Sequence, residues 1–230
     1  MLGHRNSEWC GHGPVLEQDI AITNISLDLI GQARNFYQLA ASRMSSETTE
    51  DTLAYFRNDR EFRNCLIMEL PKGDWAFTTL RQFLVSNFQF RLYTKLAQSG
   101  NEELAAIAAK ALKEVSYHLR WSSEWVIRLG DGTDESRARM ENALTEIWHY
   151  TGELFMPAAF ESSAETGFDL AALQPAWMEE VTTVFDEAGL SLPATGWMHS
   201  GGKTGIHTEY MGYILAEMQS VARAHPDAQW

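Results

Sequence analysis

Helical periodicity is the feature that most limits what this chain can fold into. Apolar residues recur at steps of three and four over several long segments, and the chain lacks alternating β-branched runs joined by two-residue turns. We expect the first long segment to bury a stripe formed by Ile22, Ile25, Leu29, Ala33, Phe36, Ala40 and Met44. The pattern therefore predicts an all-α fold.

Residues that start and stop helices divide this pattern. Pro14 suits the first position of the first long helix. Asp74 is a good N-cap for a second long helix that Gly100 stops, and Asn101 caps a third that reaches Gly130.

Three further helices complete the prediction. One begins at Asp134, and another begins at Pro175 and is closed by Gly189. The last runs from about residue 207 to Ala224. Four long helices with short connections indicate a helical bundle, and 230 residues suit a single domain over residues 1–230.

Charge and composition exclude several function classes. The formal net charge is −13, so we expect no nucleic-acid partner and no membrane surface, since both are held by clusters of Lys and Arg. No stretch approaches the roughly 18 apolar residues of a membrane span, and residues 1–13 do not resemble a secretory signal. The two cysteines, Cys10 and Cys65, suit free thiols in the cytoplasm.

A di-metal site in a helical bundle requires two Glu-x-x-His motifs, and this chain has one, Glu146–His149. We interpret it as a solvated Glu and a partly exposed His beside a core tryptophan. His118 lies in a better setting, but Val115 stands where the second motif needs its carboxylate. His118 is therefore expected to be an interior, hydrogen-bonded residue.

The segment G-W-M-H-S-G-G-K-T, residues 196–204, has some likeness to a phosphate-binding loop. Trp197 stands where that loop requires glycine, and no strand precedes it. A plain turn is the favoured interpretation, although Lys203 in such a turn could still contact an anion.

Several segments carry a resemblance that spans nearly the whole chain in order. They are S-E-W-C-G-H-G-P-V-L-E-Q-D-I (Ser7–Ile20), L-D-L-I-G-Q-A-R-N-F (Leu27–Phe36), L-A-Y-F-R-N-D-R-E-F (Leu53–Phe62), A-K-A-L-K-E-V-S-Y-H-L-R (Ala109–Arg120), R-L-G-D-G-T (Arg128–Thr133) and G-G-K-T-G-I-H-T-E-Y-M-G-Y-I-L-A-E-M-Q (Gly201–Gln219). On these segments the chain resembles the C-subunit family of the ring-1,2-phenylacetyl-CoA epoxidases.

The resemblance implies a ferritin-like fold and a supporting role in a monooxygenase complex of aerobic phenylacetate degradation. It implies a direct partner, the di-iron catalytic A-subunit, together with a small B-subunit and a reductase that carries FAD and a 2Fe-2S cluster and uses NADPH. The complex forms the ring epoxide of phenylacetyl-CoA. Family members usually begin earlier, so the first helix is expected to be truncated at its N-terminus.

The resemblance also assigns the positions at which the catalytic relative binds iron. They are Glu8, Leu29, Gln32, Ser86, Val115 and His118. Only Glu8 and His118 retain a ligand side chain, so the family pattern implies a degenerate di-iron site with no metal and no catalytic residue in this chain.

Two alternatives stay open. The chain could be a di-metal oxidase in its own right, using Glu8, His118, Glu146 and His149. It could instead be a CoA-binding module that shares a substrate pocket with the catalytic A-subunit, with Lys203 on the phosphates. The charge of −13 argues against strong CoA binding by the chain alone.

Overall fold

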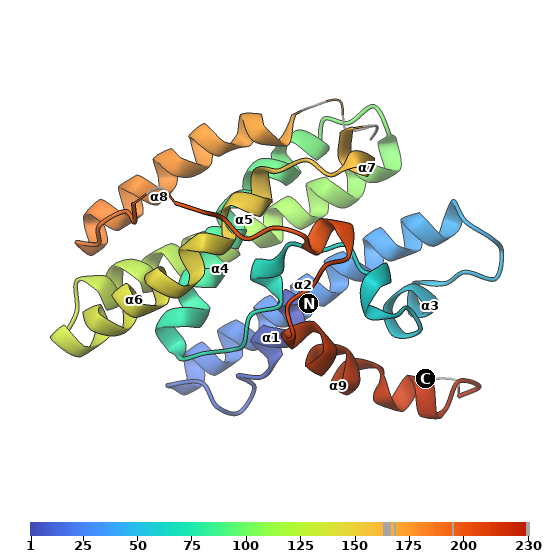
Figure 1. Ribbon diagram of the computed structural model, residues 1–230, viewed down its shortest axis with the longest axis horizontal. Helices are drawn as coiled ribbons and strands as arrows, with labels where there is room; N and C mark the ends of the chain where they lie inside the picture. Colours follow the sequence, from blue (N-terminus) through green and yellow to red (C-terminus); the bar gives the residue numbers. More distant parts are fainter. Residues whose placement is uncertain (163–166, 168, 195, 229–230) are drawn as a thin grey trace. The chain divides into compact units, whose positions relative to one another are not determined.

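A computed structural model of the chain describes residues 1–162, 167, 169–194 and 196–228 (Figure 1). Every regular element among these residues is a helix, which confirms the all-α prediction and agrees with a ferritin-like bundle. The chain divides into two compact units, each described here by itself. The first unit comprises residues 1–71 and 201–230, and the second comprises residues 72–200.

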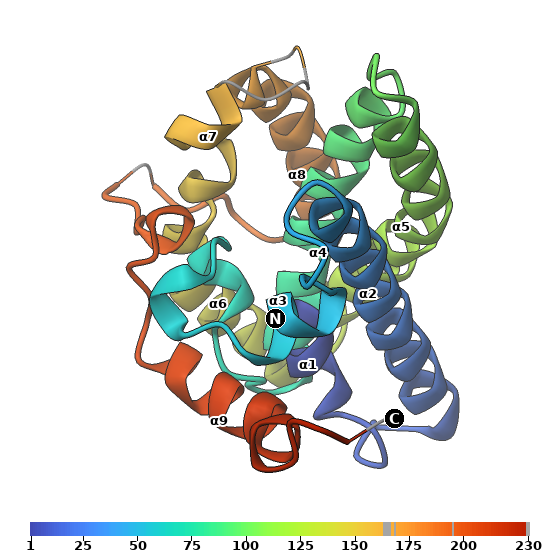
Figure 2. The same cartoon turned by 90° about the vertical axis from the view of Figure 1, so that its right-hand side faces the viewer.

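Four α-helices form the first unit. α1 (Leu2–Ser7) packs on α2 (Leu16–Ser42), which packs on α3 (Glu50–Tyr55), and α3 packs on α9 (Tyr210–Ala224). Figure 2 shows the short α1 beside the much longer α2. Residues from both ends of the sequence therefore build one core.

The burial of α2 differs from the prediction in its second half. Ile22, Ile25 and Leu29 are buried as expected, whereas the prediction was wrong for Ala33, Ala40 and Met44, which are exposed. α1 has only six residues and meets α2 near residues 26–30, so it cannot cover the later turns. Periodicity marks a face that can be buried, but it does not tell how far a neighbouring helix extends.

Side chains of α9 bind the open end of α3. The guanidinium of Arg223 donates to the carbonyl oxygens of Tyr55 (3.2 Å) and Phe56 (3.1 Å). Gln219 donates to the carbonyl of Ala54 at 3.2 Å. These carbonyls have no partner within a helix that ends at residue 55, so α9 supplies the missing donors.

The second unit contains the other long helices. α4 (Trp75–Leu96) packs against α5 (Glu102–Gly130), α6 (Asp134–Ile147) and α8 (Gln174–Ala188), as Figure 1 shows. All residues from 76 to 88 are buried, so α4 is the central helix of this unit.

The predicted helix boundaries of this unit are largely confirmed. Asp74 accepts a hydrogen bond from the amide of Phe77 at 2.9 Å, and Asn101 accepts one from Leu104 at 3.1 Å. Gly189 ends α8 with φ = 65°, a conformation that glycine adopts without steric cost. α4 ends at residue 96, earlier than the predicted stop at residue 100.

Short helical segments connect these elements. They are η1 (Asp59–Glu61), η2 (Leu66–Met68), η3 (Trp148–Tyr150), η4 (Gly152–Phe155), α7 (Ala159–Ser162), η5 (Leu170–Leu173) and η6 (Gly202–Thr204).

The structure also bears on the state of the two cysteines and on membrane-spanning helices. Cys10 and Cys65 are both free, as expected. Within the described residues, none of the helices is both long and apolar enough to cross a membrane.

Candidate functional site

The six positions assigned by the resemblance fall in both units. In the first unit, Leu29 and Gln32 are buried on α2, and Glu8 follows the last residue of α1 with its side chain 32% exposed. In the second unit, Ser86 on α4 and Val115 and His118 on α5 are completely buried. All of these positions except Glu8 are therefore interior.

Glu8 has a cationic partner within its own unit. The Nη1 atom of Arg5 donates to the carboxylate of Glu8 at 2.7 Å. Arg5 is itself buried, and its Nε and Nη2 atoms donate to the backbone carbonyl of Glu69 at 3.1 and 3.0 Å. The guanidinium thus neutralises the carboxylate and is held in place by the backbone.

The positions in the second unit lie on two helices that pack against each other, α4 and α5. The hydroxyl of Ser86 accepts a hydrogen bond from Gln82 Nε2 at 2.7 Å. Val115 precedes His118 by three residues, so it occupies the same face of α5 with an apolar side chain. The confirmed burial of His118 matches the interior histidine that the sequence predicts.

The donor set at these positions does not fit a di-iron centre. Leu29 and Val115 offer no nitrogen or oxygen donor, and the carboxylate of Glu8 is bound by Arg5. Among residues 1–162, 167, 169–194 and 196–228, the structure contains no group of three or more His, Cys, Asp or Glu side chains that could hold a metal ion.

The exposures along the Glu146–His149 motif match the solvated Glu, partly exposed His and core tryptophan that the sequence predicts. Glu146 is exposed, Trp148 is buried, and His149 is half-buried on η3. His149 Nδ1 donates to the carbonyl of Trp197 at 3.1 Å, and the amide of His199 donates to the carbonyl of His149 at 2.8 Å. Burial and, to a lesser extent, the charge of His149 lower the pKa of His199.

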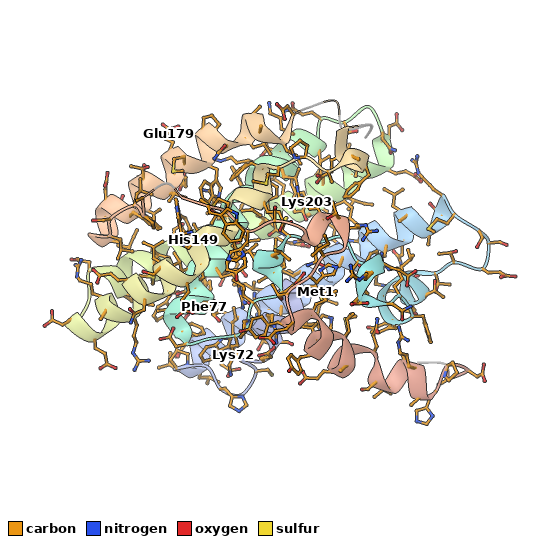
Figure 3. All side chains as sticks on the ribbon, viewed as in Figure 1. Met1, Lys72, Phe77, His149, Glu179 and Lys203 are labelled. Carbon is orange, nitrogen blue, oxygen red and sulfur yellow. The ribbon has the colours of Figure 1, made fainter. Side chains whose placement is uncertain are left out.

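Residues 201–205, at the end of the glycine-rich segment, belong to the first unit and are folded against residues 60–66. A Cβ atom at Gly202 would collide with the carbonyl oxygen of Asn64, and one at Gly205 would lie 2.5 Å from that of Arg60. Gly205 also has φ = +82°. Lys203, which Figure 3 labels, is buried. These glycines therefore permit close backbone packing rather than an open anion loop.

Sequence reasoning missed a buried carboxylate in the first unit. Glu69 is completely buried and accepts four hydrogen bonds. Asn64 Nδ2 (2.9 Å) and His207 Nδ1 (2.5 Å) donate to its Oε1 atom. The amide (2.9 Å) and hydroxyl (2.8 Å) of Thr208 donate to Oε2. The carboxylate is therefore fully satisfied, as a buried charge requires.

His207 has an acceptor at each ring nitrogen. Its Nδ1 atom faces Glu69, and its Nε2 atom lies 3.2 Å from the carbonyl oxygen of Phe62. Both partners are oxygen atoms, so each ring nitrogen lies where it can donate a hydrogen bond. The pair joins two segments that are 138 residues apart, and no local motif marks such a long-range partner.

Two comparisons with known proteins bear on the function of this chain. The whole chain, residues 1–230, matches the family model described as phenylacetic acid catabolic protein. It is 45% identical over 233 aligned residues to the C-subunit of 1,2-phenylacetyl-CoA epoxidase from Escherichia coli (strain K12). The alignment covers 100% of this chain and 94% of that protein.

Proposed function

Because the chain belongs to the phenylacetic acid catabolic protein family and is similar over its full length to an epoxidase C-subunit, we propose that it is the non-catalytic, structural subunit of a phenylacetyl-CoA monooxygenase. In this role it pairs directly with the di-iron catalytic A-subunit in the cytoplasm. The small B-subunit and a reductase with FAD, a 2Fe-2S cluster and NADPH complete the complex.

One observation carries this proposal. At the positions where the catalytic relative is expected to bind iron, Leu29 and Val115 are buried apolar side chains, and the Glu8 carboxylate is neutralised by Arg5. Buried apolar atoms stabilise a helical core without the cost of burying carboxylates that lack a metal. The six positions therefore support a packing role in place of a catalytic one.

An exposed apolar stripe on α2 supports a protein partner. Leu16, Ile20 and Leu27 follow one another at steps of four and seven, so they share one side of the helix, and they are 72%, 52% and 62% exposed. A row of large exposed apolar side chains is typical of an interaction surface. The net charge of −13 disfavours a second copy of this chain as the partner and favours a different protein.

Co-expression with the catalytic A-subunit tests the pairing. We expect the two chains to elute together on gel filtration, and we expect Leu27→Glu to weaken that association because it places a charge in the apolar stripe. Ala40→Glu is the matched control, since Ala40 is exposed on the same helix outside the stripe. Independent elution of the two wild-type chains would contradict the proposal.

Metal analysis tests the non-catalytic role. After aerobic purification we expect fewer than about 0.2 iron atoms per chain, because a di-metal site would hold about two. We also expect His149→Ala to leave the epoxidation rate of the reconstituted complex unchanged, since His149 is bound to a backbone carbonyl. Two iron atoms per chain, or loss of turnover in this variant, would favour the independent oxidase.

Calorimetry with coenzyme A tests the remaining alternative. Lys203 is buried, which does not favour its use on CoA phosphates. We expect no CoA binding by the isolated chain. Binding that Lys203→Ala removes would instead support a CoA-binding module.

A further inference from the structure

A cavity of about 150 Å³ lies within the first unit and opens to solvent on one side. We call it the α2–α3 pocket. Its walls come from α1, α2, α3 and α9 of this unit and from Phe62. Its apolar lining is formed mainly by Leu29, Ala33, Tyr37, Ala54, Phe62 and Met218.

The volume limits what the pocket can hold. An apolar protein cavity of about 150 Å³ accommodates a single benzene ring. A CoA thioester is many times larger than this volume. The size and lining together select a compact apolar ring.

Two aromatic walls of the pocket are held in position by one cation. Arg57 Nη2 donates to the hydroxyl of Tyr37 at 2.8 Å. The same guanidinium lies 5.2 Å from the ring centroid of Tyr37 and 4.3 Å from that of Phe62. Cation–π contacts of this kind fix the orientation of both rings, so the walls are ordered before a ligand arrives.

The charged side chains of the pocket disfavour anions. Glu50 and Asp51 both line the pocket, and the pKa of Glu50 is lowered, chiefly by the hydrogen bond from Gln38, so it remains ionised. Arg34 also donates to Glu50 at 3.2 Å, and Arg57 is not among the residues that line the pocket. Burial lowers the pKa of the Met1 amino group, another lining group, to about 6, so Asp51 leaves the lining with one net negative charge. Burial lowers the pKa of His4 to about 4, so this lining residue is neutral at pH 7.

We propose that the α2–α3 pocket binds a small, neutral, single-ring aromatic compound. The ring packs between the apolar walls at Leu29, Tyr37 and Phe62, and the acidic side chains of the lining reject aromatic carboxylates of the same size. This site involves no metal and no reaction, and it does not depend on the proposed role in the complex.

Titration of the full chain with toluene tests the site. We expect saturable binding by calorimetry, with chemical-shift changes in the Met218 methyl group. Ala33→Phe and Ala54→Leu each add atoms to the pocket, so each should weaken toluene binding at least tenfold. Ala40→Phe is the matched control, because Ala40 is exposed seven residues further along α2 and does not line the pocket.

Phenylacetate provides the second arm of the experiment. It carries the same ring with a carboxylate, so we expect it to bind at least tenfold more weakly than toluene at pH 7. Absence of saturable toluene binding to the wild-type chain would overturn the proposal. Equal toluene binding by wild type and both filled variants, or equal binding of phenylacetate, would also overturn it.

Discussion

Glu69 places a carboxylate in the interior of the first unit, where it would be costly without donors. Asn64, His207 and Thr208 surround it, and Arg5 binds the backbone carbonyl of the same residue. The side chain and main chain of one residue therefore connect α1, the segment before α9 and residues 64–69. Networks of this kind stabilise a fold only when every member is satisfied.

Glu69→Gln should lower the free energy of unfolding by about 2–4 kcal/mol. The amide group must turn its NH2 toward donors that now bind an oxygen, and His207 loses its carboxylate partner. Urea denaturation followed by circular dichroism measures the change.

Glu47→Gln is the control for this substitution, because Glu47 is exposed and should tolerate the same chemical change. If the two variants unfolded at the same urea concentration, the Glu69 network would not contribute to stability in the way described.

At the scale of elements, α5 and α8 of the second unit approach each other closely near their C-terminal ends. A Cβ atom at Gly130 would lie 2.6 Å from the carbonyl oxygen of Ala188 and 2.8 Å from its Cβ atom. The last residue of α5 is therefore a glycine for steric reasons. The sequence marked Gly130 only as a helix stop.

Gly130→Ala should lower the free energy of unfolding by about 1–3 kcal/mol, because the added methyl group forces α5 and α8 apart. Thermal unfolding monitored by circular dichroism measures this. Gly212→Ala in α9 is the control: its Cβ atom meets no atom within 4 Å, so the substitution should raise stability by up to about 1 kcal/mol. A gain in stability at both positions would refute the steric explanation.

At the scale of the whole molecule, the order of the chain constrains how it unfolds. The first unit contains both ends of the sequence, and the second unit is the uninterrupted segment between them. α9 can bind the end of α3 only after residues 72–200 have been spanned. The single domain over residues 1–230 stays a prediction, and it implies that the whole chain unfolds in one cooperative transition.

Differential scanning calorimetry tests this prediction. We expect one transition whose calorimetric and van't Hoff enthalpies agree, and we expect Glu69→Gln to shift the entire transition to lower temperature. Two resolved transitions, of which only one moves in the variant, would show that the two units fold independently.

The sequence by itself determined the helical class, the main boundaries and the family. Local rules suffice for these, because a side chain such as Asp74 or Asn101 caps the helix that follows it, and apolar spacing reports the period of the backbone. The interior location of His118 also followed from its own helix.

Only the tertiary structure decided which long-range partners meet. The end of burial along α2, the Arg5–Glu8 pair, and the contact of Glu69 with His207 depend on where one segment stops beside another. The spacing of residues along a chain carries no information about a neighbour that lies 138 residues away. Those contacts come from packing, which is a property of the folded chain and not of any segment alone.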